Sequence, residues 1–155
     1  MTRPSDAHAV ISRAAQQRGS RTATTTNRYA AVGRQTEEDF GLFDYRMAPG
    51  TAGPGAHYHH QFSETFYVLE GELAVLNKEE WVTIGAGDLV YVPRSVVHGF
   101  RNDAAVDARF LILFTPGVPR EEYFDGLAAW ENAGITPTPE ELDAFALRHD
   151  QVNLR

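Results

Sequence analysis

Hydrophobic and polar residues alternate in short runs along the middle of the chain, from residue 27 to residue 114, and residues that favour turns separate the runs. Such alternation, with a period of two, is typical of strands that bury one face. The pattern predicts strands over residues 28–32, 40–48, 64–69, 72–76, 81–84, 88–92, 96–101 and 109–114. Many short strands at this spacing predict a β-sandwich or a β-barrel.

A helical pattern begins only near residue 117. Pro119 suits the first position of a helix, and the apolar residues that follow it recur on one helical stripe. These apolar residues are Tyr123, Phe124, Leu127 and Trp130. A second helix is predicted directly afterwards, with Thr138 as N-cap, Pro139 at the first position and Glu141 completing a capping box. We expect both helices to pack over an open face or edge of the β body and to carry no catalytic residue.

The composition narrows the functional classes. With 155 residues, of which 43% are hydrophobic, the chain is long enough for one domain with its own core. It has no cysteine, so a disulfide, a thiolate nucleophile and a cysteine-ligated metal are excluded, and a metal would need histidine and carboxylate ligands. No apolar run approaches the roughly 20 residues of a membrane span, and the N-terminus lacks the apolar core of a secretory signal. We therefore expect a cytoplasmic protein with no membrane partner.

The net charge of −7 is unevenly distributed. Residues 1–28 contain five arginines against one aspartate, which leaves a net charge of −11 for residues 29–155. This acidic body argues against nucleic acid as a partner, because nucleic-acid binding depends on clustered lysine and arginine. Residues 1–26 are rich in serine, threonine and arginine, and they are predicted to form a flexible arm. The alternative is an organellar transit peptide, which is also rich in arginine and poor in acidic residues.

Histidines gather before the third predicted strand. His57 and His59 lie two apart, so on an extended segment both side chains project from the same face, whereas His60 points the opposite way. Glu64 has the wrong parity for that face, so the chain must turn or bulge before it if the carboxylate is to join them. His98, on another predicted strand, is the candidate for a fourth group. A single histidine is more often hydrogen-bonded than metal-bound, but several histidines crowded with a carboxylate are costly unless they are paired or bind a cation.

The spacing of these residues resembles the two motifs of the cupin superfamily. Residues 57–71 match the first motif, H-x-H-x4-E-x6-G, at His57, His59, Glu64 and Gly71. Residues 87–102 match the second motif, G-x5-P-x-G-x2-H-x3-N, at Gly87, Pro93, His98 and Asn102. Two positions depart from the pattern: Ser95 replaces a glycine of the second motif, and Thr51 stands where a glycine precedes the first. The short spacing between the motifs is similar to that of small single-domain bacterial cupins, including quercetin-dioxygenase-like proteins.

The resemblance implies an all-β fold, a cupin double-stranded β-helix or jelly-roll barrel over residues 27–116. Residues 117–155 would then form an extension of two short C-terminal helices packed on the barrel. The resemblance also implies one divalent transition metal bound by His57, His59, Glu64 and His98. Three imidazoles and one carboxylate suit Fe, Mn, Ni, Cu, Co or Zn without discriminating among them. Octahedral coordination would leave two positions for water or substrate, as catalytic sites do.

Apolar residues that share a face with these ligands are candidates for a substrate pocket. They are Phe66, Val68, Val96 and Phe100, together with Phe43, Tyr45 and Met47 on the preceding strand. The alternative is that these seven residues form only the core. An aromatic pocket with a metal at its base favours a small apolar or phenolic substrate that carries oxygen donors.

The first functional hypothesis is a metal-dependent dioxygenase, in which Glu64 is both a ligand and the catalytic group that accepts a proton from a substrate hydroxyl. A carboxylate beside a cation stays ionised, so this role requires Glu64 to loosen from the metal during turnover. A non-redox cupin cyclase or isomerase, and a non-catalytic cupin that binds or senses a small molecule, are the alternatives. The exposed edge strands of a small barrel predict a homodimer, with the segment before Phe40 adding to a partner sheet.

Overall fold

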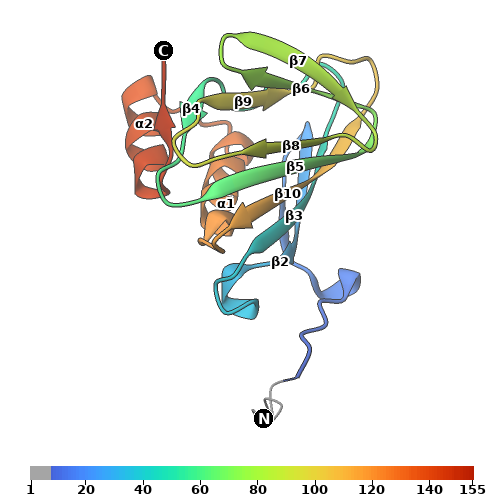
Figure 1. Ribbon diagram of the computed structural model, residues 1–155. Coiled ribbons are helices and arrows are strands. Elements are labelled where there is room, and N and C mark those ends of the chain that lie inside the picture. The colour runs from blue at the N-terminus through green and yellow to red at the C-terminus, as the bar shows by residue number, and fades with distance from the viewer. Residues whose placement is uncertain (1–7) are drawn as a thin grey trace.

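Two antiparallel β-sheets pack face to face around the core (Figure 1). The computed structural model describes residues 8–155. The first sheet has the strand order β1-β2-β3-β10-β5-β8, and the second has the order β11-β4-β9-β6-β7. The strands are β1 (Gly19–Arg21), β2 (Thr25–Ala31), β3 (Gly41–Met47), β4 (His57–Tyr58), β5 (Ser63–Glu70), β6 (Glu72–Asn77), β7 (Glu80–Gly85), β8 (Leu89–Val92), β9 (His98–Arg101), β10 (Ala108–Thr115) and β11 (Val152–Asn153). Two short 3₁₀ turns, η1 (Ala14–Gln16) and η2 (Gly33–Gln35), precede β1 and β3.

The fold is a jelly-roll β-sandwich. Each of the predicted strands overlaps a strand of the structure, so the mostly β jelly-roll prediction is confirmed. The prediction of a closed barrel is wrong, because no hydrogen-bonded ladder joins the two sheets within residues 8–155, and β1, β8, β11 and β7 stay as edges. Sandwiches and barrels share the same alternation of inward and outward residues, so the sequence pattern does not distinguish them.

The core between the sheets is largely aromatic. β3 and β10 pair along their whole length and alternate between buried and half-buried residues. The inward rings of Phe43 and Phe114 meet edge to face, with their centroids 5.0 Å apart. On the outer face of the same strands, the carboxylate of Asp44 is bound by Arg28 at 2.6 Å and by Arg109 at 2.9 Å. The two faces of these strands therefore have the polarity that the alternation predicts.

The chain before β3 belongs to the first sheet. β1 pairs with β2, and β2 pairs with β3, both in antiparallel register. The predicted flexible arm over residues 1–26 therefore extends too far, because residues 19–21 and 25–26 are already strand, while residues 1–7 lie outside the described residues. The segment before Phe40 extends its own sheet and leaves β1 as an edge, so its addition to a partner sheet stays a prediction. Threonine is β-branched, so a threonine-rich segment suits an edge strand as well as a mobile arm.

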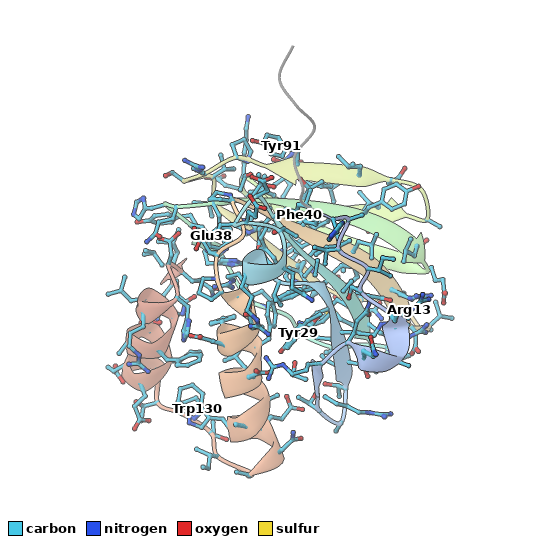
Figure 2. All side chains as sticks on the ribbon, turned by 90° about the horizontal axis from the view of Figure 1, so that it is seen from below. Arg13, Tyr29, Glu38, Phe40, Tyr91 and Trp130 are labelled. Atoms are coloured by element: carbon cyan, nitrogen blue, oxygen red, sulfur yellow. The ribbon has the colours of Figure 1, made fainter. Side chains whose placement is uncertain are left out.

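Two helices, α1 (Arg120–Asn132) and α2 (Pro139–Arg148), lie next to each other at one end of the sandwich (Figure 1). Figure 2 shows Trp130 between them, and its ring lies 4.9 Å from that of Phe145. The capping box predicted at Thr138 and Glu141 is confirmed. α1 starts one residue later than predicted, with Pro119 as its N-cap. Among the described residues, neither helix is both long and apolar enough to span a membrane.

Candidate metal centre

The four predicted ligands come together in one buried cluster. One donor atom from each of His57, His59, Glu64 and His98 lies within 4.8 Å of every other. All four side chains are almost completely buried. The sequence thus predicted correctly which residues meet, although they come from three strands and a loop.

Strand pairing explains how these residues meet. His57 on β4 lies directly opposite His98 on β9, and their ring centroids are 4.2 Å apart. Glu64 comes from β5 in the other sheet, because the chain crosses between the sheets after His59. This crossing changes the parity of the chain, as expected, and brings the carboxylate to the same point. His60 is exposed and lies outside the cluster, again as expected.

The outer nitrogen of each histidine ring is held by a backbone carbonyl. The Nδ1 atoms of His57, His59 and His98 lie 2.8, 2.6 and 3.0 Å from the carbonyl oxygens of Gly55, Asp150 and Val96, respectively. Carbonyls only accept hydrogen bonds, so Nδ1 is a protonated nitrogen in each ring. In the neutral rings of His57 and His59 this leaves Nε2 with a lone pair toward the cluster.

The donors fit a divalent transition metal. His59 Nε2 is buried without a hydrogen-bond partner in the described part of the chain, which is costly for a polar atom unless a cation completes it. Carbonyl-anchored imidazoles of this kind are the usual partners of a protein-bound metal. Neutral imidazoles with one carboxylate suit Fe, Mn, Co, Ni, Cu or Zn.

The shifted pKa values of the same groups favour the binding of a cation. Burial lowers the pKa of His57 to about 3 and that of His59 to about 4, so both rings are neutral at neutral pH. Burial alone would raise the pKa of Glu64, but the hydrogen bond from His98 and the nearby positive charges outweigh it and hold this pKa well below its usual range. His98 Nε2 lies 2.7 Å from Glu64 Oε2; burial would lower the pKa of His98, but this contact raises it. A metal bound by His98 Nε2 and by the Glu64 carboxylate would replace this direct contact.

The second motif supports the cluster through two residues that do not touch it. Ser95, which replaces the usual glycine, has a φ of 63° in the left-handed region that glycine adopts at least cost, and its backbone N–H donates to His59 O at 2.6 Å. Asn102 is buried, and its Nδ2 donates to the carbonyls of Met47, Ala48 and Val106 at 2.8–3.1 Å. The turn after β8 thus fixes the loop that carries His59, and Asn102 anchors the chain after β9.

The C-terminal segment, residues 149–155, also fixes the ligand loop, residues 59–62. The sequence motifs did not indicate this contact. In addition to its carbonyl bond to His59, Asp150 accepts the backbone N–H of His60 at 3.2 Å and of Gln61 at 2.6 Å through its carboxylate. β11 then pairs with β4, and this places Asn153 opposite His57. No spacing rule links residue 150 to residue 59, so only the folded chain reveals this contact.

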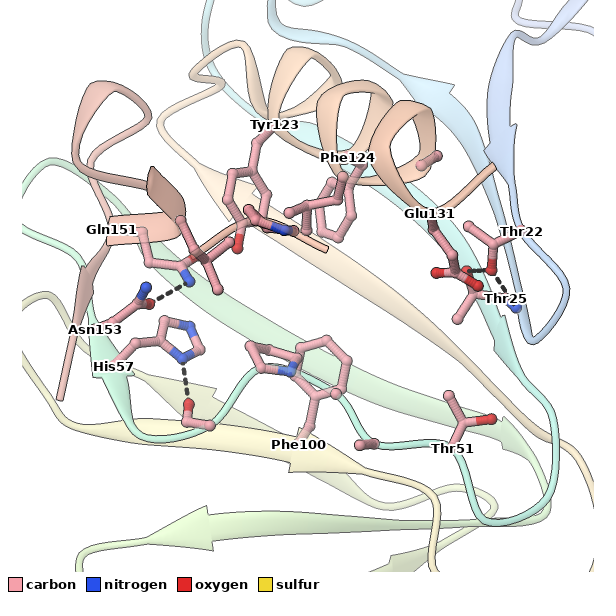
Figure 3. Close-up of a pocket in the computed structure, with 18 of the residues that line it drawn as sticks. Thr22, Thr25, Thr51, His57, Phe100, Tyr123, Phe124, Glu131, Gln151 and Asn153 are labelled. Atoms are coloured by element: carbon pink, nitrogen blue, oxygen red, sulfur yellow. Dashed lines mark hydrogen bonds between the residues drawn. The ribbon is translucent and has the colours of Figure 1, made fainter. Parts of the chain in front are cut away.

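A cavity of about 520 Å³ extends from the cluster toward the helices. His57 and Glu64 line its inner end, and α1 and the C-terminal segment form much of its wall. Figure 3 shows Phe100 facing Tyr123 and Phe124 across the cavity. The same view shows His57 at one end and Glu131 at the other, so the middle of the cavity is aromatic and its ends are polar.

Two of the seven predicted pocket residues, Tyr45 and Phe100, line this cavity. Four others are fully buried in the core and do not line it: Phe43, Met47, Phe66 and Val68. Val96 lies in the turn before β9 and is 41% exposed. The inward faces of the strands mostly pack against each other between the sheets, so the open space lies only at the end of the sandwich where the helices sit.

The C-terminal part, where the sequence indicated no chemistry, contributes several polar residues to the cavity wall. Arg120, Tyr123 and Gln151 are among them. Arg120 is 2% exposed and donates to His149 O at 2.9 Å and to Gln151 Oε1 at 3.1 Å. The only signal in the sequence was an arginine at the beginning of an amphipathic helix, which is common on protein surfaces.

Comparison with known proteins agrees with this architecture. The profile of the cupin domain family matches residues 43–114. Quercetin 2,3-dioxygenase of Bacillus subtilis is 29% identical over 136 residues, and the match covers 86% of this chain and 38% of that protein. The chain therefore spans well under half the length of that relative.

Solved structures show the same fold at lower identity. An RmlC-like cupin from Shewanella frigidimarina is 20% identical with a TM-score of 0.60, and the match covers 75% of this chain and 96% of that one. The polyketide cyclase RemF from Streptomyces resistomycificus is 21% identical with a TM-score of 0.56, and the match covers 66% of this chain and 76% of that one. Residues 43–114, which contain both motifs and the buried cluster of three histidines and one glutamate, therefore form a cupin domain.

Proposed function

We propose that this protein is a metal-dependent enzyme of the dioxygenase type that acts on a small apolar or phenolic substrate. The observation that carries the proposal is the buried cluster of three carbonyl-anchored histidines and one glutamate at the inner end of an aromatic cavity. A structural metal would ordinarily be closed off by its ligands, whereas this cluster adjoins a space large enough for a small molecule. The similarity to a quercetin dioxygenase supports the redox version of the chemistry.

The residues of the cluster have separate roles in this proposal. His57, His59 and His98 hold the metal through Nε2, and Glu64 is the fourth ligand. A bound divalent metal would supply Lewis acidity and, for Fe, Mn, Co, Ni or Cu, redox chemistry with dioxygen. Glu64 is ionised at neutral pH, so it accepts the proton of a substrate hydroxyl when it moves away from the ligand position.

The cavity wall provides binding and exclusion of water. Tyr45, Phe100 and Phe124 present ring faces and edges to the space, and Tyr45 and Phe100 are themselves packed edge to face at 6.0 Å. Rings in this arrangement bind a flat aromatic substrate through apolar contact. Burial raises the pKa of Tyr45 to about 12, so its hydroxyl stays protonated and can donate a hydrogen bond.

The test is metal analysis of protein purified without a metal-affinity column, followed by oxygen-uptake assays with flavonols and simpler phenols. We expect about one Fe, Mn, Co, Ni or Cu per chain, and oxygen uptake that depends on this metal. His98→Ala should lose most of the metal, whereas His60→Ala should retain it because His60 is an exposed neighbour outside the cluster.

Three results would change the proposal. Stoichiometric Zn with turnover of a substrate in the absence of oxygen would replace it with cyclase or isomerase chemistry. Ligand binding without turnover would favour a binding or sensing cupin. Failure to bind any of these metals, even after reconstitution, would refute it.

A further inference from the structure

Arg120 is a buried cation in the cavity wall, and it forms no ion pair within residues 8–155. Its side chain is 2% exposed, and it takes part in none of the salt bridges found among the described residues. It faces aromatic rings instead, with the guanidinium carbon 4.1 Å from the ring centre of Tyr123 and 5.2 Å from that of Phe62. A buried charge is costly, and proteins ordinarily pair it.

Hydrogen bonds within the protein occupy only some of the N–H donors of the Arg120 guanidinium. Its two terminal nitrogens each donate one bond, to His149 O and to Gln151 Oε1, and this fixes the C-terminal segment. The Nε–H is buried and has no partner in the described part of the chain. A guanidinium carries five N–H donors arranged for two parallel bonds to a carboxylate, so an anchoring role for the C-terminal segment leaves binding capacity unused.

Neither Glu64 nor Asp150 forms an ion pair with Arg120. Glu64 attracts it electrostatically, but the Glu64 carboxylate is already bound to His98 at 2.7 Å and approaches His59 at 3.7 Å. Asp150 is also engaged, because its two carboxylate oxygens accept the backbone N–H groups of the ligand loop. The positive charge therefore lines the cavity close to the metal centre without a carboxylate of its own.

We propose that Arg120 binds a carboxylate of the substrate, and that the substrate is an aromatic or apolar carboxylic acid. The inference rests on the proposed function in one respect: the same cavity that holds Arg120 is taken to hold the reacting molecule. Arg120 receives the acid group from the cavity wall. The rings of Phe100, Tyr123 and Phe124 receive the apolar body (Figure 3). Enclosure by aromatic side chains keeps water away from the pair and strengthens it.

The test compares an aryl acid with its neutral amide. Binding of 3-phenylpropanoate and 3-phenylpropanamide to the protein as purified is measured by calorimetric titration, with metal content determined for every sample. We expect the acid to bind at least tenfold more tightly than the amide. Arg120→Gln should abolish this preference, because the amide side chain keeps polar contacts but has no charge. Arg148→Gln is the matched control, since it removes the same charge from an exposed position on α2 outside the cavity and should leave the preference unchanged.

Two outcomes would overturn the inference. One is equal binding of the acid and the amide to the wild-type protein. The other is a preference for the acid that persists in Arg120→Gln, which would place the carboxylate on the metal alone. If Arg120→Gln fails to fold or loses metal, the wild-type protein is titrated again after removal of metal by a chelator. The preference for the acid must then persist, because Arg120 is still present, and its disappearance counts against the proposal. None of these measurements requires turnover or oxygen. The role of Arg120 can therefore be tested even if the dioxygenase proposal fails.

Discussion

Asp150→Asn tests whether the C-terminal segment fixes the metal site. The carboxylate of Asp150 accepts two backbone N–H groups in the loop that carries His59, at 3.2 and 2.6 Å, and the substitution replaces one acceptor oxygen with an NH₂ group. One hydrogen bond to a charged acceptor is lost, and a donor then faces a donor. Such bonds contribute about 1.5–3 kcal/mol when buried, and these partly exposed ones should contribute about 1–1.5 kcal/mol. The φ of residue 150 is 54°, a value that asparagine tolerates as well as aspartate, so the backbone is not strained.

We expect this substitution to weaken metal binding about tenfold, because 1.4 kcal/mol corresponds to a factor of ten and partners of metal ligands commonly contribute 10- to 100-fold. The assay is calorimetric titration of chelator-treated protein with Ni²⁺, with thermal unfolding measured in parallel. Asp103→Asn is the control, because it removes the same charge from an exposed pair with Arg101. A Ni²⁺ affinity of Asp150→Asn within twofold of the wild type would refute the proposed coupling between the C-terminal segment and the metal centre.

Three further predictions concern stability and assembly. Asn102→Asp should lower the free energy of unfolding by about 2–4 kcal/mol in urea denaturation, because a carboxylate would face three carbonyl oxygens that now accept from Nδ2; an unchanged midpoint would contradict this anchoring role. Hydrogen bonds from Arg109 lower the pKa of Asp44, so this pair stabilises the fold above about pH 4 and loses its effect as the pH falls through the lowered pKa. Asp44→Asn should therefore lower the free energy of unfolding by about 1–2 kcal/mol at pH 6 and by much less at pH 2. An equal decrease at both pH values would exclude the ionic explanation. The homodimer stays a prediction. Leu89 and Tyr91 are 59% and 60% exposed on the edge strand β8, and Figure 2 shows Tyr91 projecting from the molecule, so replacing both with lysine should convert the dimer to a monomer in light scattering. A monomeric parent chain would contradict the prediction.

The sequence was sufficient to predict the strands, because alternation is a local pattern, and the meeting of the four candidate ligands, because they match the two cupin motifs. Alternation fixes which face of a strand is buried, and the cupin spacing connects His57 and Glu64 to His98 across the sheets. The parity conflict at Glu64 even predicted that the chain must turn before it. The structure adds the reason for the turn, which is the crossing from one sheet to the other.

The cavity could not be predicted in the same way, because it depends on packing between distant segments. Phe43 and Tyr45 lie two apart on the same face of one strand, so the alternation predicts the same environment for both. In the structure, Phe43 packs in the core and Tyr45 faces the cavity. The difference arises from where α1 and the C-terminal segment lie along the strand. The same packing buries Arg120, whose position in the sequence resembles that of a solvated helix residue.

In the proposed function, the metal ligands and most of the substrate-binding wall come from different parts of this chain. All four candidate ligands lie within residues 57–98, inside the region that matches the cupin family, whereas most of the cavity wall is built by residues 20–25 and 120–155 outside it. A relative that shares the motifs can share the metal chemistry and still enclose a different space above it. For this reason the similarity to the quercetin dioxygenase bears on the proposed type of reaction, whereas the proposed substrate class rests on α1 and residues 149–155, where Arg120 supplies a buried positive charge that a substrate could neutralise.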